Sequence, residues 1–371
     1  MRIAIIGARS VPGRYGGFDT VATELAPRLA RRGLDVTVYC QPRYAAADRP
    51  PTYNGVRLVY LPAIARRSFE TVSHEALCLL HALRARYDLI YVLGLRASIL
   101  YMGARAARVP VCFNTDGLDW RRRKWGALAR RYLHWSERMA VRVSAHHLVA
   151  DSRAIAAYFS ETYGVSPEFI PYGAPVIDGA STEPLARWGL EPRTYFLVVC
   201  RIEPENNVDV IVSAFEAART NMKLVVVGAT NYRSKYLERL RQTASPAVMF
   251  VGAVYDRPVV DALYSHALAY VHGHEIGGTN PALLHGMAAG ACALAHDVVY
   301  NREVLGDAGL YWQPHEESLA ALIDKVVADR ALAARLGQAA RARARAQYDW
   351  EAVAGAYQGY FERLLSAFSG R

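Results

Sequence analysis

Residues 269–290 read AYVHGHEIGGTNPALLHGMAAG, and the fold of the chain is decided around them. A strand-like segment, Ala269–His272, precedes a loop with two adjacent glycines, Gly277–Gly278, and a helix-like segment follows. Asn280 is a favourable N-cap, and Pro281 suits the first helical position because its missing N–H would have no partner there. Glycines let a ligand approach the backbone, and the free amides at a helix start bind anions. The stretch predicts a phosphate or diphosphate site, with a simple tight turn after a strand as the alternative.

Apolar runs and helical patterns alternate along the rest of the chain. It opens with the apolar run Ile3–Gly7, a glycine-containing loop, helical spacing over Thr20–Arg32 and a second apolar run at Val36–Tyr39. This order is typical of a doubly wound α/β fold. The pattern breaks at Pro171–Pro175, and a second series begins at Tyr195–Cys200. We therefore predict two Rossmann-like domains that face each other across a cleft.

The composition is that of a folded protein with two hydrophobic cores. The chain has 371 residues, enough for two domains of ordinary size, and 52% of them are hydrophobic, which excludes disorder. No apolar stretch is long enough for a membrane span, and Ile3–Ile6 is too short for a signal-peptide core. The five cysteines and eleven histidines show no ligand spacing. We expect a soluble cytoplasmic protein without a metal site.

Positive charge is concentrated in the N-terminal half. Residues 1–170 hold 25 Lys and Arg against 13 Asp and Glu, whereas residues 171–371 hold 19 against 21. A basic half suits an anionic partner, which leaves nucleic acid, an acidic membrane surface and a phosphorylated substrate as candidates. A solvated arginine-rich surface is the alternative.

Four motifs follow one another in a distinctive order. They are RYGGFD at 14–19, NTDGLDW at 114–120, RIEPENN at 201–207 and GGTNP at 277–281. This order resembles the bacterial retaining family-4 glycosyltransferases, most closely the rhamnosyltransferase-like branch that builds capsules and cell-wall polysaccharides. The resemblance covers nearly the whole chain and implies a GT-B fold. It implies an acceptor-binding domain at 1–174, a nucleotide-sugar-binding domain at 175–348, and a terminal helix at 349–371 that crosses back to the first domain.

The chemistry of transfer suggests roles on the donor side. Transfer from a nucleoside-diphosphate sugar develops negative charge on the leaving diphosphate. Arg201, just after an apolar strand, suits a bidentate grip on that group, and the amides of Gly278 and Thr279 would hold it from another side. Because arginine and helix dipole supply this stabilisation, we predict no metal and no cofactor beyond the sugar nucleotide as co-substrate. The predicted donor-binding residues are Gly16, Gly17, Arg201, Asn206, Gly277, Gly278, Thr279, Asn280 and His285.

Two positions depart from the family pattern. Family-4 enzymes commonly carry a lysine shortly after the arginine, where this chain has Glu205–Asn207. They also generally carry a glutamate on the helix after the glycine loop, which bonds the nucleoside ribose, and here His285 stands in its place. A histidine can still donate to or accept from a hydroxyl, and residues 281 and 285 share a helix face.

Two carboxylates join Arg201 in the predicted catalytic set. Glu275, upstream of the glycines, suits contact with hydroxyls of the donor sugar, with a solvated loop carboxylate as the alternative. Asp116 follows the apolar run 111–113, where α/β folds place site residues. It suits an acceptor-side base or sugar ligand, and a turn residue bonding its own backbone is the alternative. Tyr15–Gly17 offers amides and an aromatic ring from the first domain, or forms a structural turn.

A basic and aromatic segment spans Trp120–Trp125 and continues through Arg130–Tyr132 and Trp135. Three interpretations compete: it binds the diphosphate of a lipid-linked acceptor, lies on an anionic bilayer, or is a solvated basic helix. Nucleic acid is disfavoured because no nucleic-acid-binding fold accompanies the charge. We favour acceptor and inner membrane surface together. The predicted acceptor-binding residues are Arg14, Tyr15, Trp120 and Arg121.

The sequence thus leads to one main hypothesis and three alternatives. The hypothesis is a retaining hexosyltransferase that moves a deoxysugar, with L-rhamnose from dTDP-rhamnose as the first candidate, to a hydroxyl of a polyprenyl-diphosphate-linked saccharide or a glycosylated natural product. The alternatives are a nucleotide-sugar epimerase, an inactive sugar-nucleotide-binding homologue, and an NAD-dependent enzyme. The last is disfavoured because the first glycine loop lacks the G-x-G-x-x-G spacing.

Overall fold

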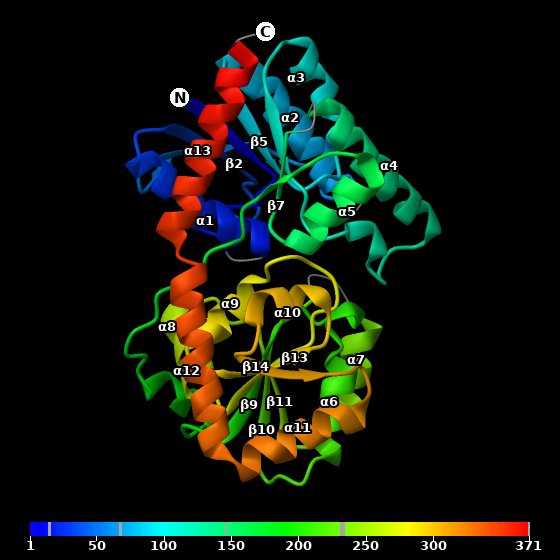
Figure 1. Ribbon diagram of the computed structural model, residues 1–371, viewed down its shortest axis with the longest axis vertical. Helices are drawn as coiled ribbons and strands as arrows, with labels where there is room; N and C mark the ends of the chain where they lie inside the picture. Colours follow the sequence, from blue (N-terminus) through cyan, green and yellow to red (C-terminus); the bar gives the residue numbers. More distant parts are fainter. Residues whose placement is uncertain (14–15, 67–68, 145–146, 231–233, 370–371) are drawn as a thin grey trace. The chain divides into compact units, whose positions relative to one another are not determined.

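The computed structural model describes residues 1–13, 16–66, 69–144, 147–230 and 234–369. Within it the chain divides into two compact units, each with its own parallel sheet covered by helices (Figure 1). The first unit comprises Met1–Arg121, Trp125–Tyr172 and Trp350–Arg371. The second comprises Arg122–Lys124 and Gly173–Asp349.

The described part of the first unit holds an eight-stranded sheet in the order β3-β4-β2-β1-β5-β6-β7-β8, parallel except for the β3–β4 pair. Its central strands are apolar and buried throughout, as expected for parallel strands covered on both faces. The strands are β1 (Arg2–Ile6), β2 (Asp35–Cys40), β3 (Thr52–Tyr53), β4 (Val56–Tyr60), β5 (Leu89–Leu93), β6 (Val111–Asn114), β7 (Leu148–Ala150) and β8 (Glu168–Phe169). The helices are α1 (Gly17–Arg31), α2 (Glu70–Ala85), α3 (Met102–Ala106), α4 (Ala127–Val143), α5 (Arg153–Tyr163) and α13 (Trp350–Ser369).

The last helix of the chain, α13, belongs to the first unit and lies beside α1 (Figure 1). The Tyr91 hydroxyl in β5 donates to the Tyr357 hydroxyl in α13 at 2.9 Å, and the Tyr91 ring also packs on Phe361. At the helix start, Glu351 forms ion pairs with arginines of α1. Apolar and ionic contacts therefore hold the terminal helix on the first unit, as the family resemblance implies.

The second unit holds a six-stranded parallel sheet in the order β11-β10-β9-β12-β13-β14 among its described residues. Its strands are β9 (Tyr195–Val199), β10 (Lys223–Val227), β11 (Val248–Gly252), β12 (Ala269–His272), β13 (Cys292–His296) and β14 (Gly309–Trp312). Its helices are α6 (Val208–Ala217), α7 (Lys235–Thr243), α8 (Arg257–His266), α9 (Pro281–Ala288), α10 (Val299–Leu305), α11 (Glu316–Ala328) and α12 (Arg330–Gln347). The strand order reverses between β9 and β12, and α/β folds bind ligands beyond the carboxyl ends of the strands at such a switch point.

Local chemistry explains why the segment after β12 folds as predicted. The Asn280 side chain accepts from the Ala282 amide at 2.9 Å, and Pro281 occupies the first position of α9, so the predicted cap is confirmed. A Cβ at Gly286 would lie 2.7 Å from the Tyr270 ring, so glycine lets α9 pack closely on β12. The fold prediction of two Rossmann-like domains is also confirmed.

Two predicted helices differ in detail. Helix α1 begins at Gly17 rather than Thr20, because glycine is a poor helix former and hides the true start from a pattern search. The sequence pattern over Ser98–Arg108 also predicts a helix, whereas the structure has a 3₁₀ turn, Ser98–Tyr101, followed by the short α3. No helix in the described part of the chain combines the length and apolar character that crossing a bilayer requires.

Candidate functional site

Two loops meet at the switch point of the second unit, one after β9 and one after β12. The Asn207 side chain donates to the Gly273 carbonyl at 2.8 Å, and the Glu275 amide donates to the Glu205 carbonyl at 3.1 Å. A Cβ at Gly273 would lie 2.2 Å from the Asn206 carbonyl oxygen, so only glycine allows this approach. The structure therefore brings the RIEPENN motif and the glycine loop into one assembly.

The predicted diphosphate residues lie on these two loops. Arg201 is exposed just beyond β9, and its carbonyl accepts from the Asn206 side chain at 2.6 Å. Gly278 and Thr279 are buried immediately before the start of α9, and Gly277 has a φ of +147°, which favours glycine. A cation and a helix start thus sit on neighbouring loops, and each of them favours a bound anion.

Two stacked imidazoles underlie the glycine loop. His272 and His274 have ring centroids 4.4 Å apart and an interplanar angle of 14°. Burial lowers the pKa of His272 to about 3. Burial, with further lowering by His272, Arg201 and Arg122, holds the pKa of His274 well below its usual range. Both rings are therefore neutral at physiological pH and add no positive charge beneath the loop.

Asn301 in α10 connects this loop to the next strand end. Its side-chain amide donates to the His274 carbonyl at 3.0 Å and to the His296 carbonyl at 2.9 Å. No sequence motif marks Asn301 as a site residue, because its two acceptors are backbone carbonyls.

Glu275 lies at the edge of this assembly with a cationic partner. Its carboxylate forms a short ion pair with Arg123, and about a third of its side chain is exposed. It is therefore not a purely solvated loop carboxylate, and the pair with Arg123 still leaves it accessible.

His285 faces a different neighbour from the one that the resemblance implies. Its Nε2 lies 2.6 Å from Asp261 Oδ1, and its ring stacks on Tyr264 with centroids 4.6 Å apart. Burial lowers the pKa of His285, and the hydrogen bond that its ring donates to Asp261 opposes that shift. His285 is thus half of a His–Asp pair that joins α9 to α8, and one of its nitrogens is engaged.

The remaining predicted residues belong to the first unit. Asp116 follows β6 with a left-handed φ of +54°, and its amide donates to Asn114 Oδ1 at 3.0 Å. Trp120 stacks on His134 of α4, and the Arg121 guanidinium lies over the Trp120 ring.

Gly16 and Gly17 form the exposed N-cap and first residue of α1. Their amides are at a helix start rather than within the loop that was predicted. Arg14 and Tyr15 lie outside the described residues.

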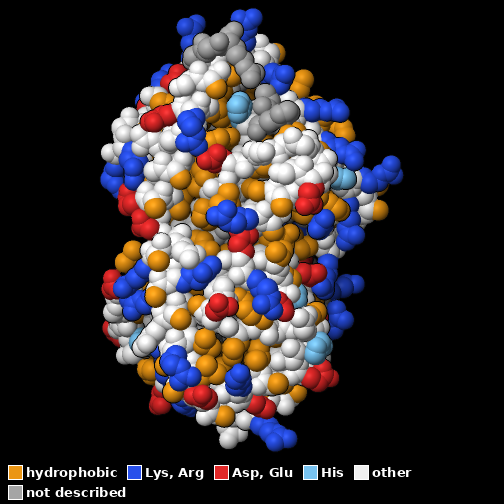
Figure 2. All heavy atoms as spheres, viewed as in Figure 1, with side chains coloured by type: hydrophobic (Ala, Val, Ile, Leu, Met, Phe, Trp, Pro, Cys, Tyr) orange, Lys and Arg blue, Asp and Glu red, His pale blue; other side chains and the backbone are white. Residues whose placement is uncertain are grey.

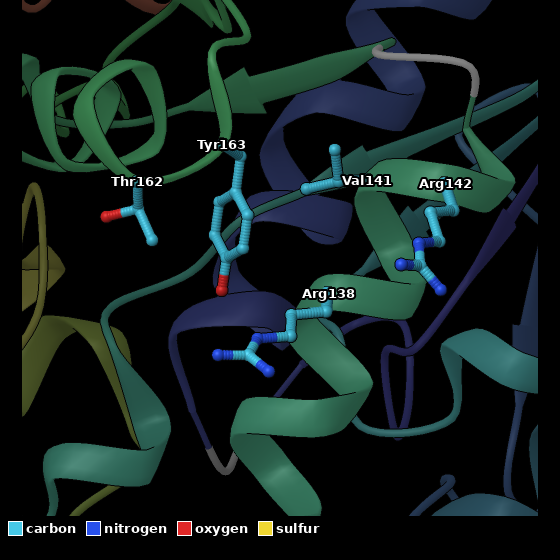
Figure 3. Close-up of a pocket in the computed structure, with 5 residues that line it drawn as sticks. All are labelled: Arg138, Val141, Arg142, Thr162 and Tyr163. Carbon is cyan, nitrogen blue, oxygen red and sulfur yellow. The ribbon is translucent and has the colours of Figure 1, made fainter.

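A separate hollow of about 470 Å³ lies where α4 and α5 end (Figure 3). It is lined by Arg138, Val141, Arg142, Thr162 and Tyr163. Both helices end where the following parallel strands begin, which is the edge opposite to the one that carries site residues in α/β folds. We assign the hollow no part in the chemistry at the switch point.

Comparisons with known proteins agree with this geometry. Residues 16–173 match the family model of the glycosyl transferase 4-like domain, and residues 185–343 match that of the glycosyl transferases group 1. No curated protein matched the chain in sequence.

Similar solved structures span the whole chain at low identity. Sucrose-phosphate synthase from Thermosynechococcus elongatus has a TM-score of 0.81 and 20% identity, covering 99% of each chain. HepE from Anabaena, solved in complex with UDP-glucose, has a TM-score of 0.75 and 18% identity, covering 99% of this chain and 100% of its own. The UDP-forming trehalose-phosphate synthase from Burkholderia vietnamiensis has a TM-score of 0.71 and 14% identity, again covering 99% and 100%. These likenesses show the GT-B fold.

Proposed function

The chain is a glycosyltransferase of the GT-B, family-4 type, and we propose that it transfers a sugar from a nucleoside diphosphate to an acceptor hydroxyl with retention of anomeric configuration. The observation that carries the proposal is that the loop bearing Arg201 is hydrogen-bonded to the glycine loop that leads into α9, at the switch point of the second unit. An exposed cation on a loop next to a helix start suits a diphosphate better than it suits a neutral ligand.

In the proposed reaction the acceptor oxygen forms a bond to the anomeric carbon while the bond from that carbon to the diphosphate breaks. The acceptor proton passes to an oxygen of the leaving diphosphate on the same face. Arg201 and the amides before α9 stabilise the charge that develops on this group. We propose that no metal ion is needed, because these groups already supply the stabilisation. Asp116 and Glu275 are proposed to bind sugar hydroxyls, the former on the acceptor side.

The donor is proposed to be a dTDP- or UDP-sugar, with dTDP-L-rhamnose as the first candidate. HepE is solved with UDP-glucose, which supports a pyrimidine nucleotide, and the motif order supports a deoxysugar. Thermal-shift screening against UDP, dTDP, GDP, ADP and their sugars tests this, since a ligand at 100 times its Kd stabilises by about 2.7 kcal/mol. If no nucleoside diphosphate shifts the melting temperature, the proposal is wrong.

We propose that the acceptor is lipid-linked and that helix α4 lies on the inner membrane surface. Leu128, Tyr132 and Trp135 recur at four- and three-residue spacing along α4, with 82%, 41% and 43% of their surface exposed. Arginines flank this apolar stripe, and Figure 2 shows Lys and Arg side chains gathered on the face over α4. An exposed apolar stripe bordered by cations suits an anionic bilayer.

Flotation with liposomes tests the membrane part of the proposal. Binding to vesicles with anionic lipid should exceed binding to neutral vesicles and fall as salt rises. A Trp135→Ser and Leu128→Ser variant should lose most of the binding. Equal flotation with neutral and anionic vesicles would contradict it.

The pairing of His285 with Asp261 favours one second candidate, a homologue that binds a sugar nucleotide without transferring the sugar. A site whose helix histidine is engaged elsewhere holds the nucleoside differently from the family pattern. Donor binding without turnover across an acceptor panel would favour this candidate. Product analysis in the absence of acceptor separates both from an epimerase.

A further inference from the structure

Three consecutive basic residues, Arg122–Lys124, belong to the second unit, although Arg121 and Trp125 on either side belong to the first. The sequence alone groups them with the acceptor- and membrane-facing segment. The structure places them instead against the two loops of the switch point. Arg123 pairs with Glu275 of the glycine loop, as described above.

The other two cations share one buried carboxylate. Arg122 Nη1 lies 3.8 Å and Lys124 Nζ 3.7 Å from the same oxygen, Oε1 of Glu205. The Glu205 side chain is only 2% exposed, and neither of its oxygens makes a hydrogen bond to any described residue. A buried carboxylate is costly unless cations compensate it. Both distances exceed hydrogen-bond length, so Glu205 attracts the two cations electrostatically.

Glu205 belongs to the assembly of two loops at the switch point, where the donor is proposed to bind. Its carbonyl accepts the Glu275 amide, and its neighbour Asn207 holds the Gly273 carbonyl. Arg122 and Arg201 both lower the pKa of His274, which agrees with their lying around the same imidazole of the glycine loop. The loop Pro204–Asn207 has no cation of its own, so positive charge beside it comes from outside the loop.

We propose that Arg122 and Lys124 are ligands of the donor diphosphate, and that the buried Glu205 positions them. This inference rests on the proposed function and assigns it two further binding residues. Glu205 keeps Arg122 and Lys124 beside the loops that carry Arg201 and on which the leaving group is proposed to lie. A diphosphate carries enough negative charge to engage all three cations, whereas a nucleoside monophosphate lacks the second phosphate.

The test is calorimetric binding of UDP, dTDP, UMP and dTMP to the full chain. Arg122→Gln and Lys124→Met should each weaken diphosphate binding about ten- to hundred-fold, since each removes one hydrogen bond between charged groups. Monophosphate binding should change much less. The matched control is Lys325→Met with Arg335→Gln, two exposed cations late in α11 and early in α12, which should bind diphosphates like the wild type.

Glu205→Gln separates positioning from a purely structural role. It should reduce the preference for diphosphate over monophosphate, a ratio that a general loss of stability would not move. Lys124→Arg should keep most of the affinity that Lys124→Met loses. If the wild type prefers diphosphates and both cation variants keep that preference, this inference is overturned while the proposed function stands. If the wild type binds no nucleoside diphosphate, the proposed function itself fails.

Discussion

The two units reverse their strand order in the same way, between β1 and β5 in the first and between β9 and β12 in the second. The residues at these two switch points nevertheless differ in kind. At the first, a Cβ on Gly7 would lie 2.4 Å from the Leu93 carbonyl oxygen, and one on Gly94 would lie 3.0 Å from the Phe18 ring. Glycines there serve close packing. At the second, Gly273 also permits close packing, but the loop on which it packs carries Arg201. The same sheet topology thus places a switch point in each unit, and the side chains around each point determine whether it suits an anion.

The substitution Arg201→Ala tests whether the anion site lies in the second unit, and it has the largest expected effect. We expect kcat to fall about 10²- to 10³-fold, because the variant loses the cation that stabilises the leaving group. Arg9→Ala, after β1 at the first switch point, removes an arginine that lies over the Tyr44 ring and should cost much less. Initial rates with saturating donor measure both, and equal losses would contradict the assignment of the anion site to the second unit.

Alanine at Gly7 and at Gly273 separates the packing role that both glycines share from the donor binding proposed for the second unit alone. Gly273→Ala and Gly7→Ala should each lower the free energy of unfolding by about 1–3 kcal/mol, because both place a Cβ against a backbone carbonyl. Only Gly273→Ala should also lose donor affinity. Urea unfolding and calorimetry separate the two effects. Gly103→Ala, where nothing lies within 4 Å of the new atom, is the matched control and should be no less stable than the wild type.

Acid should destabilise the second unit more than the first. Burial lowers the pKa values of His272, His274 and His285 in the folded second unit, so protonation of the unfolded chain destabilises this unit as pH falls below about 6.5, by about 1.4 kcal/mol per pH unit for each group. Burial raises the pKa of Glu75 in the first unit to about 7. Folded Glu75 therefore gains a proton first, which stabilises this unit as pH falls from about 7 toward 4.5 and opposes the destabilisation from His74, whose pKa burial lowers.

Hydrogen exchange at pH 7 and pH 5, corrected for intrinsic rates, measures this for each unit. The segments around β12 and α9 should exchange faster at pH 5, and those around α2 should change less. Glu75→Gln removes the contribution that opposes His74, so acid should destabilise the first unit of this variant more and leave the response of the second unit unchanged. Faster exchange in both units alike would contradict the prediction.

Metal removal should have the smallest effect. A chelator at millimolar concentration should change the initial rate by less than about twofold, because Arg201 and the helix start are proposed to supply the charge that a metal would otherwise provide. The rate after chelation and after readdition of Mg²⁺ or Mn²⁺ measures this. A loss restored by either ion would show that the donor site is incomplete without a metal.

Local signals made much of the second unit predictable. The cap at Asn280 and Pro281 depends on residues within one helical turn, and Arg201 directly follows an apolar strand, so both could be found from the chain itself. The partner of His285 could not, because Asp261 lies 24 residues earlier on another helix. The attachment of Arg122–Lys124 to Glu205 likewise depends on packing between segments about 80 residues apart. Sequence patterns report periodicity and caps, whereas these pairings arise only once the sheet has formed.

The return of α13 to the first unit has a consequence for how the protein is made. Tyr91 in β5 finds its partner Tyr357 266 residues later in the chain, after the whole second unit has been translated. Until then one side of the first sheet lacks its aromatic cover. The N-terminal half therefore leaves the ribosome as an incomplete domain, and its final packing waits for the last helix to emerge.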